Sequence, residues 1–135
     1  YAALSIADVF ATTSQHEGFG LVFLEAMAFG LPILCYDRGG QTDFLRSEET
    51  GFVVRLNDET AFTRALVALH ADAQGRHRYG EHNRALVENY FIDTCARRYE
   101  EVFEEQMRKT ALLRGRGLPA APSQPSPASQ GKGKP

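Results

Sequence analysis

Short apolar runs alternate with turn residues along the first half of the chain. Three of these runs predict buried strands, at residues 9–13, 33–36 and 52–54. The segment between the first two runs, 21–29 (LVFLEAMAF), predicts a short helix that Gly30 ends, with Pro32 just beyond. Gly39 and Gly40 introduce a second brief helix at about 41–46. Strand, helix, strand, helix and strand with such short links indicate right-handed crossovers in a parallel sheet.

Helical periodicity takes over after the third strand. Asn57 or Asp58 is a suitable cap for a helix that is expected to break at Gly75, and a second helix follows to about Tyr90. Asp93 is a suitable cap for a third helix. Apolar residues share one face in the first of these helices (Phe62, Leu66, Leu69) and in the third (Cys95, Tyr99, Val102, Phe103, Met107). The glutamates at 100, 101, 104 and 105 are interpreted as a solvated helix face.

The composition is that of a folded domain followed by a tail. Of the 135 residues, 43% are hydrophobic and 24% charged. Residues 1–114 are expected to form one domain, and 115–135, rich in Pro, Ser and Gly, to be disordered. About three strands are few for a doubly wound sheet, which usually has about five or six, and the chain opens with Tyr1. We therefore expect it to be a piece of a longer protein, with the first part of this domain upstream.

Charge and cysteine content exclude several classes of function. The net charge of −2 argues against a nucleic-acid binder that works through a basic surface. The two cysteines, Cys35 and Cys95, form no metal-binding pattern and are interpreted as packed side chains in a reducing compartment. The most apolar stretch is interrupted by Glu25 and Pro32, so no transmembrane segment is expected.

The segment with candidate chemistry is a glycine-rich turn at the start of the helix predicted for 21–29. The first amides of a helix have no helical partner, and the helix dipole adds partial positive charge there. Gly18 and Gly20 would allow close approach to a ligand, so the turn predicts an anion site that suits a diphosphate. The sequence lacks the third glycine of a nicotinamide site, because Phe23 stands in its place, and it lacks a Gly-Lys-Ser/Thr phosphate loop.

Two carboxylates bracket this turn. Glu17 precedes it and Glu25 follows eight positions later, in the second turn of the predicted helix. At helical rise this spacing spans about 12 Å, which is similar to the length of a nucleoside diphosphate sugar. Each carboxylate has two oxygens that accept hydrogen bonds from a vicinal diol. One glutamate is therefore suited to the sugar hydroxyls and the other to the ribose.

These residues, in their frame, closely resemble the family 4 (group 1) glycosyltransferases. The resemblance covers roughly residues 1–110 and is carried by these segments: Ala7-Asp8-Val9-Phe10, Glu17-Gly18-Phe19-Gly20-Leu21, Glu25-Ala26-Met27-Ala28, Gly30-Leu31-Pro32, Gly39-Gly40 and Thr50-Gly51-Phe52-Val53-Val54. It implies the GT-B fold, in which two Rossmann-like domains enclose the active site. The chain resembles the later part of the C-terminal, donor-binding domain.

The resemblance also implies residue roles. Glu17 matches the catalytic glutamate beside the transferred sugar, and Glu25 matches the glutamate that holds the ribose. The turn between them, Gly18, Phe19, Gly20 and Leu21, matches the main-chain site for the sugar and diphosphate. Family members are typically retaining and use neither metal nor cofactor. The acceptor, which is a glycan, lipid or small molecule, is expected to bind through an upstream N-terminal domain.

Other features qualify this prediction. A basic pair typical of the family lies upstream of the matching segment, so the 135-residue chain alone is expected to be inactive. Gly39-Gly40 is followed by Gln41-Thr42-Asp43, where many relatives have Pro-Glu in place of the Thr-Asp, which leaves the sugar open. Thr42 is interpreted as a cap, and Arg38, Arg46 and His16 as surface or loop side chains.

Two alternatives of other classes remain at this stage. One is a nucleotide- or sugar-binding module without turnover. The other is a different GT-B enzyme, such as a nucleotide-sugar epimerase or a phosphorylase-like protein, although no lysine precedes Lys109 to hold a phosphorylase cofactor. A cytoplasmic location is expected because activated sugars are found there; peripheral contact at the inner face of the membrane would depend on the upstream domain.

Overall fold

The computed structural model describes residues 1–113, which separate into two units at Ala96 and Arg97. The first unit contains the whole sheet, and the described part of the second is the remainder of one long helix. The tail predicted for 115–135 lies outside the described residues, as does residue 114.

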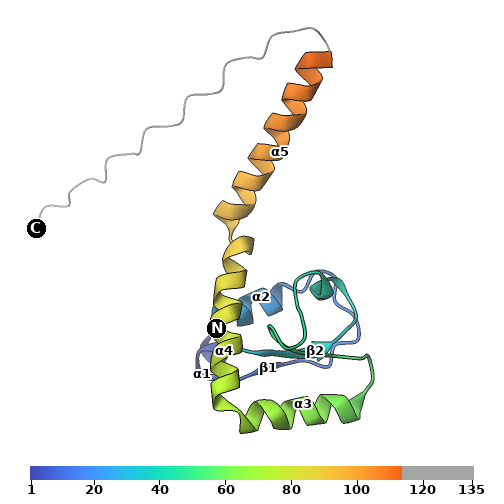
Figure 1. Ribbon diagram of the computed structural model, residues 1–135, viewed down its shortest axis with the longest axis vertical. Coiled ribbons are helices and arrows are strands. Elements are labelled where there is room, and N and C mark those ends of the chain that lie inside the picture. The colour runs from blue at the N-terminus through green and yellow to red at the C-terminus, as the bar shows by residue number, and fades with distance from the viewer. Residues whose placement is uncertain (114–135) are drawn as a thin grey trace, which may run out of the picture. The chain divides into compact units, whose positions relative to one another are not determined.

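The described residues contain the parallel sheet that the sequence predicts, with three strands, of which β1 and β2 are labelled in Figure 1. The strands pair in the order β1-β2-β3. β1 is Phe10–Ala11, β2 is Ile33–Tyr36 and β3 is Gly51–Val54. β1 is shorter than the predicted 9–13. The last hydrogen bond between β1 and β2 runs from Thr12 N to Leu34 O at 3.0 Å. Ser14 N then donates to the Thr12 hydroxyl at 3.2 Å, so the chain turns instead of continuing the strand.

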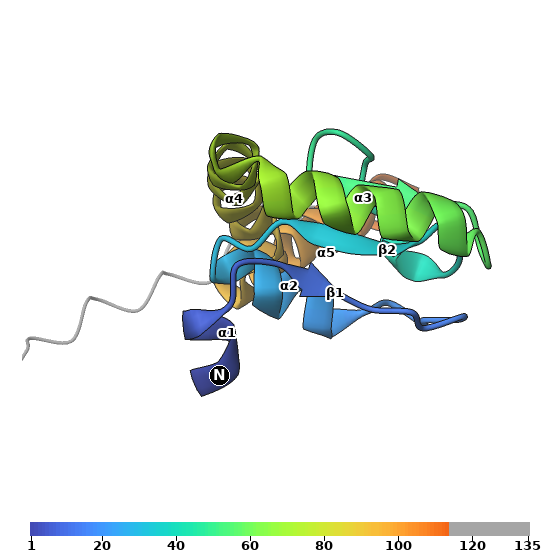
Figure 2. The same ribbon diagram turned by 90° about the horizontal axis from the view of Figure 1, so that it is seen from below.

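Helices cover both faces of this sheet, with α2 (Leu21–Ala28) on one side and α3 (Glu59–Ala71) on the other (Figure 2). Side chains along β2 alternate between the two faces. Ile33 and Cys35 belong to the core cluster under α2, which contains Phe23 and Met27, whereas Leu34 packs with Ala65 and Leu69 of α3. Because both faces are covered, every residue of β2 is buried, which explains its continuous apolar sequence.

The remaining elements of the first unit connect and support these layers. Their bounds are α1 at Ala2–Ile6, η1, a 3₁₀ helix, at Gly40–Asp43, α4 at Ala73–Val87 and the 3₁₀ helix η2 at Glu88–Tyr90. The fully buried side chain of Asn83 joins α4 to the sheet, since its Nδ2 donates to Leu31 O at 2.8 Å and to Thr50 O at 2.9 Å.

Several helix boundaries differ from the sequence prediction; the brief helix expected at about 41–46, for example, is η1 and ends at Asp43. Of the two predicted cap candidates, Asn57 and Asp58, it is Asp58 that caps α3, with its carboxylate accepting from Ala61 N at 2.8 Å. The break after α3 lies at Asp72 and not at Gly75, which is in the first turn of α4. Asp72 accepts from the Gly75 amide at 2.7 Å and so caps the new helix. The capping side chain, and not the flexibility of the glycine, sets this boundary.

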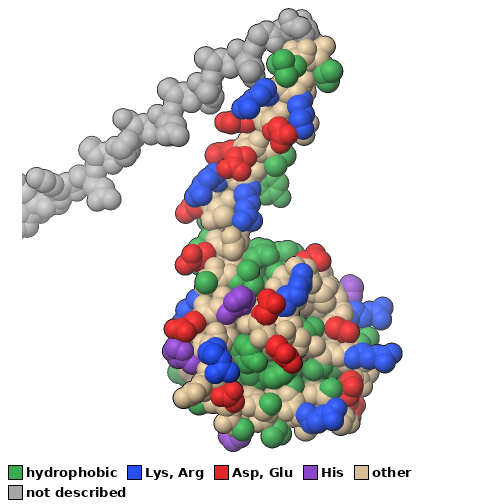
Figure 3. Space-filling model, viewed as in Figure 1, with side chains coloured by type: hydrophobic (Ala, Val, Ile, Leu, Met, Phe, Trp, Pro, Cys, Tyr) green, Lys and Arg blue, Asp and Glu red, His purple; other side chains and the backbone are tan. Residues whose placement is uncertain are grey.

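The long helix α5 spans Ile92–Leu113. Asp93 lies in its first turn and is not its cap, because the helix begins one residue earlier. The predicted apolar stripe is exposed, with Tyr99 66% and Phe103 63% accessible, and charged side chains line the helix beside it (Figure 3). No helix within residues 1–113 has the length and apolar character needed to cross a membrane.

Candidate functional site

The candidate site lies where the parallel strands end. In sheets of this kind, ligands bind in the loops that follow the carboxyl ends of the strands. The loop after β1 contains Glu17, and the loop after β2 contains Gly39 and Gly40. The two loops meet in a short parallel bridge between Glu17 and Gly39, with Gly40 N donating to Glu17 O at 3.0 Å. The backbone of Glu17 is therefore fixed by the next loop of the sheet.

Glycine is required on the side of this bridge contributed by the loop after β2. Gly39 has φ +123°, and a Cβ there would stand 2.5 Å from the carbonyl oxygen of Glu17. A Cβ on Gly40 would overlap the carbonyl oxygen of Gly18. Any other residue at either position would push the two loops apart.

The amino end of α2 follows directly. Gly20 occupies the cap position with φ +85°, and a Cβ there would stand 2.5 Å from the Phe23 ring. The Gly20 carbonyl accepts from Phe23 N at 3.0 Å. The amides of Leu21 and Val22 belong to the first turn, where the helix itself offers no acceptor. This end of α2 therefore presents amide donors with the positive end of the helix dipole.

The two glutamates occupy different surroundings. Glu17 is half-buried, in the loop before this helix end, and Glu25 is exposed, one turn beyond Leu21. That separation places Glu25 about 6 Å further along the helix axis than Leu21. Glu17 and the glycine turn thus lie in the loop before α2, and Glu25 lies in α2 itself, as the sequence predicts.

Glu25 has a partner that sequence reasoning missed. Its Oε1 accepts from the Tyr1 hydroxyl at 3.1 Å, and the Tyr1 ring stacks on Phe29 with centroids 6.0 Å apart. The hydrogen bond to this carboxylate, together with its negative charge, raises the pKa of Tyr1. A carboxylate has about four lone-pair sites, so Glu25 retains acceptor capacity beside the tyrosine.

Phe19 has a packing role that the sequence did not indicate. Its ring is 46% exposed and lies 5.5 Å from that of Phe44 and 6.4 Å from that of Tyr90. Phe44 and Tyr90 also pack together, at 5.4 Å. This aromatic cluster supports the turn through the Phe19 side chain.

Polar side chains near the second loop are used within the fold. Arg46 donates to main-chain oxygens of Thr42, Asp43 and Leu45, which ties it to the end of η1. Thr42 does not occupy the predicted cap position, which is that of Gly39; its hydroxyl donates back to Gly39 O at 2.8 Å. The cap residue of η1 is thus Gly39, so no side chain caps this 3₁₀ helix.

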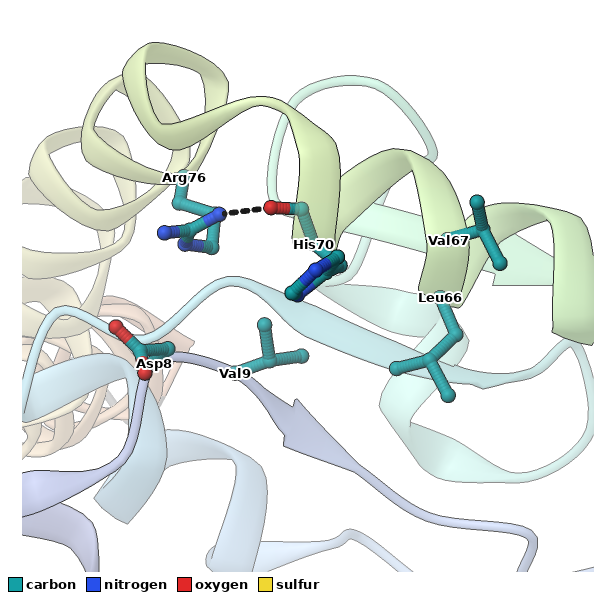
Figure 4. Close-up of a pocket in the computed structure, with 6 residues that line it drawn as sticks. All are labelled: Asp8, Val9, Leu66, Val67, His70 and Arg76. Carbon is teal, nitrogen blue, oxygen red and sulfur yellow. Dashed lines mark hydrogen bonds between the residues drawn. The ribbon is translucent and has the colours of Figure 1, made fainter.

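A separate hollow of about 420 Å³ lies between α3 and the chain that enters β1 (Figure 4). It is lined mainly by apolar groups of Val9, Leu66 and Val67, with Asp8 and Arg76 at one end and His70 near the middle. Arg76 donates to the carbonyl oxygens of Leu69 and His70 at the end of α3. None of the residues 17–25 lines this hollow.

Comparison with known proteins identifies the family. The family model of the glycosyl transferases group 1 matches residues 1–86. The chain belongs to this family. The resemblance stated from the glycine turns and the two glutamates is thereby confirmed.

Individual relatives agree with this assignment. The chain is 34% identical over 111 residues to D-inositol 3-phosphate glycosyltransferase of Streptomyces scabiei, covering 82% of this chain and 25% of that protein. It is 29% identical over 106 residues to N-acetyl-alpha-D-glucosaminyl L-malate synthase of Bacillus anthracis, covering 78% and 28%. The chain thus spans about a quarter of the length of these curated relatives.

Solved structures confirm the fold. Sucrose-phosphate synthase of Thermosynechococcus elongatus matches with a TM-score of 0.69 at 30% identity, over 78% of this chain and 27% of that one. Anabaena HepE, solved in complex with UDP, matches with a TM-score of 0.70 at 21% identity, over 76% and 29%. The sheet and its helices are therefore part of a GT-B fold, as predicted.

Proposed function

We propose that this chain is the donor-binding part of a retaining, metal-independent glycosyltransferase that transfers a sugar from a nucleoside diphosphate sugar to an acceptor. Membership of the glycosyl transferases group 1 supports the reaction class. The geometry that carries the proposal is the bridge between Glu17 and Gly39, which fixes an acidic residue directly before the amide-rich end of α2.

The diphosphate is assigned to the amino end of α2. Amides of the turn formed by Gly18, Phe19, Gly20 and Leu21 donate to its oxygens, and the helix dipole favours its negative charge. During transfer the bond from the anomeric carbon to the diphosphate oxygen breaks, and a bond from that carbon to an acceptor oxygen forms. The acceptor proton leaves to the released diphosphate or to water. Negative charge grows on the leaving group, so donors placed there beforehand lower the barrier.

The two carboxylates are assigned to hydroxyl groups on either side of the diphosphate. Glu17 would accept from hydroxyls of the transferred sugar, and Glu25 from the ribose. A carboxylate aimed at the diphosphate itself would repel it, so each has to face a neutral donor. The Tyr1 hydroxyl occupies one acceptor site of Glu25 and holds the carboxylate in one orientation beside the helix.

The acceptor is assigned to chain outside these 135 residues, because the relatives are about four times as long as the matching part. The acceptor class is a glycan, a lipid or a small molecule. We place the reaction in the cytoplasm, where activated sugars are made, with peripheral contact at the inner face of the membrane where the acceptor is a lipid.

The direct test is a donor screen with the full-length protein. The panel consists of UDP-, GDP- and ADP-sugars. With at least one of them, the enzyme should release the nucleoside diphosphate and transfer the sugar to an acceptor or to water. The product should keep the anomeric configuration of the donor by NMR, and EDTA should leave the rate unchanged. Donor binding without turnover would instead establish a binding module, and inversion at the anomeric carbon would refute the retaining assignment.

A further inference from the structure

Gln41 is a buried amide in the loop that carries the glycine pair. Its side chain is 1% exposed, and its Nε2 donates to Tyr36 O at 3.1 Å and to Arg38 O at 2.8 Å. Tyr36 is the last residue of β2, and Arg38 lies in the turn that follows. One side chain therefore fixes the path of the main chain as it leaves the central strand.

The same side chain lies behind the bridge that holds Glu17. A Cβ built on Gly39 would stand 2.5 Å from Gln41 Oε1 and 2.5 Å from Glu17 O. Gln41 Oε1 and the Glu17 main chain thus both lie against the side of Gly39 that a Cβ would occupy. A Cβ on Gly20 would also stand 3.6 Å from the Gln41 Cβ, so Gln41 lies beside the cap of α2 as well.

The polar contacts of Gln41 are incomplete. Its Oε1 is buried and has no hydrogen-bond partner. The orientation of the amide follows from its surroundings, because exchanging oxygen and nitrogen would point the oxygen at two carbonyl oxygens. A buried acceptor without a donor destabilises a fold. The unpaired oxygen does not by itself distinguish Gln41; its place against Gly39, beside the bridge to Glu17, does.

We propose that Gln41 is a positioning residue for Glu17. It holds the Gly39–Gly40 turn, and through the bridge to that turn it sets where the Glu17 carboxylate meets the transferred sugar. This inference rests on the proposed function. Gln41 does not reach the donor itself, so its loss should affect the reacting sugar and not the binding of the nucleotide.

Asn83 offers a matched control at the opposite end of the strands, where β2 and β3 begin. It is also a fully buried amide whose nitrogen bridges two main-chain oxygens and whose Oδ1 has no partner. Its acceptors, Leu31 and Thr50, precede β2 and β3, whereas those of Gln41 lie at and after the end of β2. The four residues of β2 separate these two ends of the sheet by about 13 Å. The two amides make similar contacts, but only Gln41 lies at the site.

The experiment compares Gln41→Met and Asn83→Leu in the full-length enzyme, each replacing an amide with an apolar side chain of similar size. Urea unfolding, the Kd for UDP and GDP, kcat for the donor found in the screen, and hydrogen exchange of a peptide over residues 37–44 are measured. Both variants should lose stability to a similar extent. Only Gln41→Met should lower kcat, at least tenfold, with nucleotide Kd within twofold of wild type and faster exchange at 37–44.

The possible failures are distinguishable. If Gln41→Met keeps kcat within twofold of an active wild type, the positioning role is refuted and the proposed function stands. If Asn83→Leu lowers kcat as much as Gln41→Met does, the effect is one of general stability, and the positioning role is again refuted. If the wild type transfers no sugar from any donor, both proposals are refuted together.

Discussion

Gly80 of α4 lies against the carbonyl group of Gly30, so close that a Cβ on Gly80 would overlap that oxygen. Gly30 follows the end of α2 and has φ +73°. The main chain of α4 therefore lies directly against the main chain of this turn. Asn83, one turn further along α4, then reaches Leu31 O and Thr50 O. Helix α4 can dock on the sheet in this way only because position 80 carries no side chain.

We therefore expect Gly80→Ala to destabilise the protein by about 1–3 kcal/mol, the usual range for an overpacked contact. Helix propensity alone predicts the opposite sign, since alanine is favoured over glycine inside a helix by about 1 kcal/mol. Urea unfolding followed by circular dichroism measures the difference. Gly75→Ala in the same helix is a comparison and not a neutral control, because a Cβ there would meet the carboxylate of Asp72 and disturb the cap of α4. A Gly80→Ala variant as stable as wild type would contradict the close contact.

Glu17→Gln in the full-length enzyme tests the role assigned to the half-buried glutamate. The amide keeps the size of the side chain and loses one acceptor and the charge, so hydroxyls of the reacting sugar lose a charge-assisted bond. We expect kcat to fall about 100-fold, within the range seen for single groups that act in the transition state. The Kd for the free nucleoside diphosphate should stay the same. A normal kcat would remove Glu17 from the catalytic machinery.

Glu25→Gln should act on donor binding. Loss of a charged acceptor for the ribose is expected to weaken the Kd for the nucleoside diphosphate at least tenfold, because a hydrogen bond to a charged group contributes about 1.5–3 kcal/mol. Tyr1→Phe is the comparison, because it removes only the hydroxyl that orients Glu25 and keeps the carboxylate and the ring that stacks on Phe29, so it should weaken the Kd less than Glu25→Gln does. Isothermal titration with UDP and GDP measures both. Equal affinity of Glu25→Gln and wild type would show that the carboxylate does not hold the ribose.

Much of the fold follows from the sequence because its signals are local. The run at 33–36 is β2 to the residue, and Gly30, at φ +73°, follows the end of α2 as predicted. The break at Asp72 was also encoded locally, as an acidic residue three positions before Gly75, but the glycine is the more conspicuous signal and led to the wrong boundary. β1 is short because a side-chain turn at Thr12 and Ser14 competes with the ladder.

The site was predictable only in part, for a physical reason. A glycine turn before a helix and two glutamates at fixed spacing are visible along the chain, and so is the start of α2 at residue 21. The contacts that hold them join residues far apart in sequence, such as Glu17 with Gly39 and Tyr1 with Glu25. Gln41 and Asn83 gave no signal, because a single polar residue in a loop or helix is usually exposed. Their burial depends on how the layers pack.

Cys35 provides a test of the core that depends on pH. Burial in β2, with a smaller contribution from the negative charge of Asp37, raises the pKa of its thiol from 9.0 to about 12. The unfolded chain loses this proton above about pH 9, whereas the folded chain keeps it until about pH 12, so the stability that the neutral thiol contributes falls as pH rises between these values. The free energy of unfolding of wild type minus that of Cys35→Ala should therefore decrease by about 1.4 kcal/mol between pH 8 and pH 10.

Other titrating groups cancel in this difference, since both proteins contain them. Urea unfolding at the two pH values measures it, and a difference that does not change with pH would show that the Cys35 thiol is not held neutral by the fold.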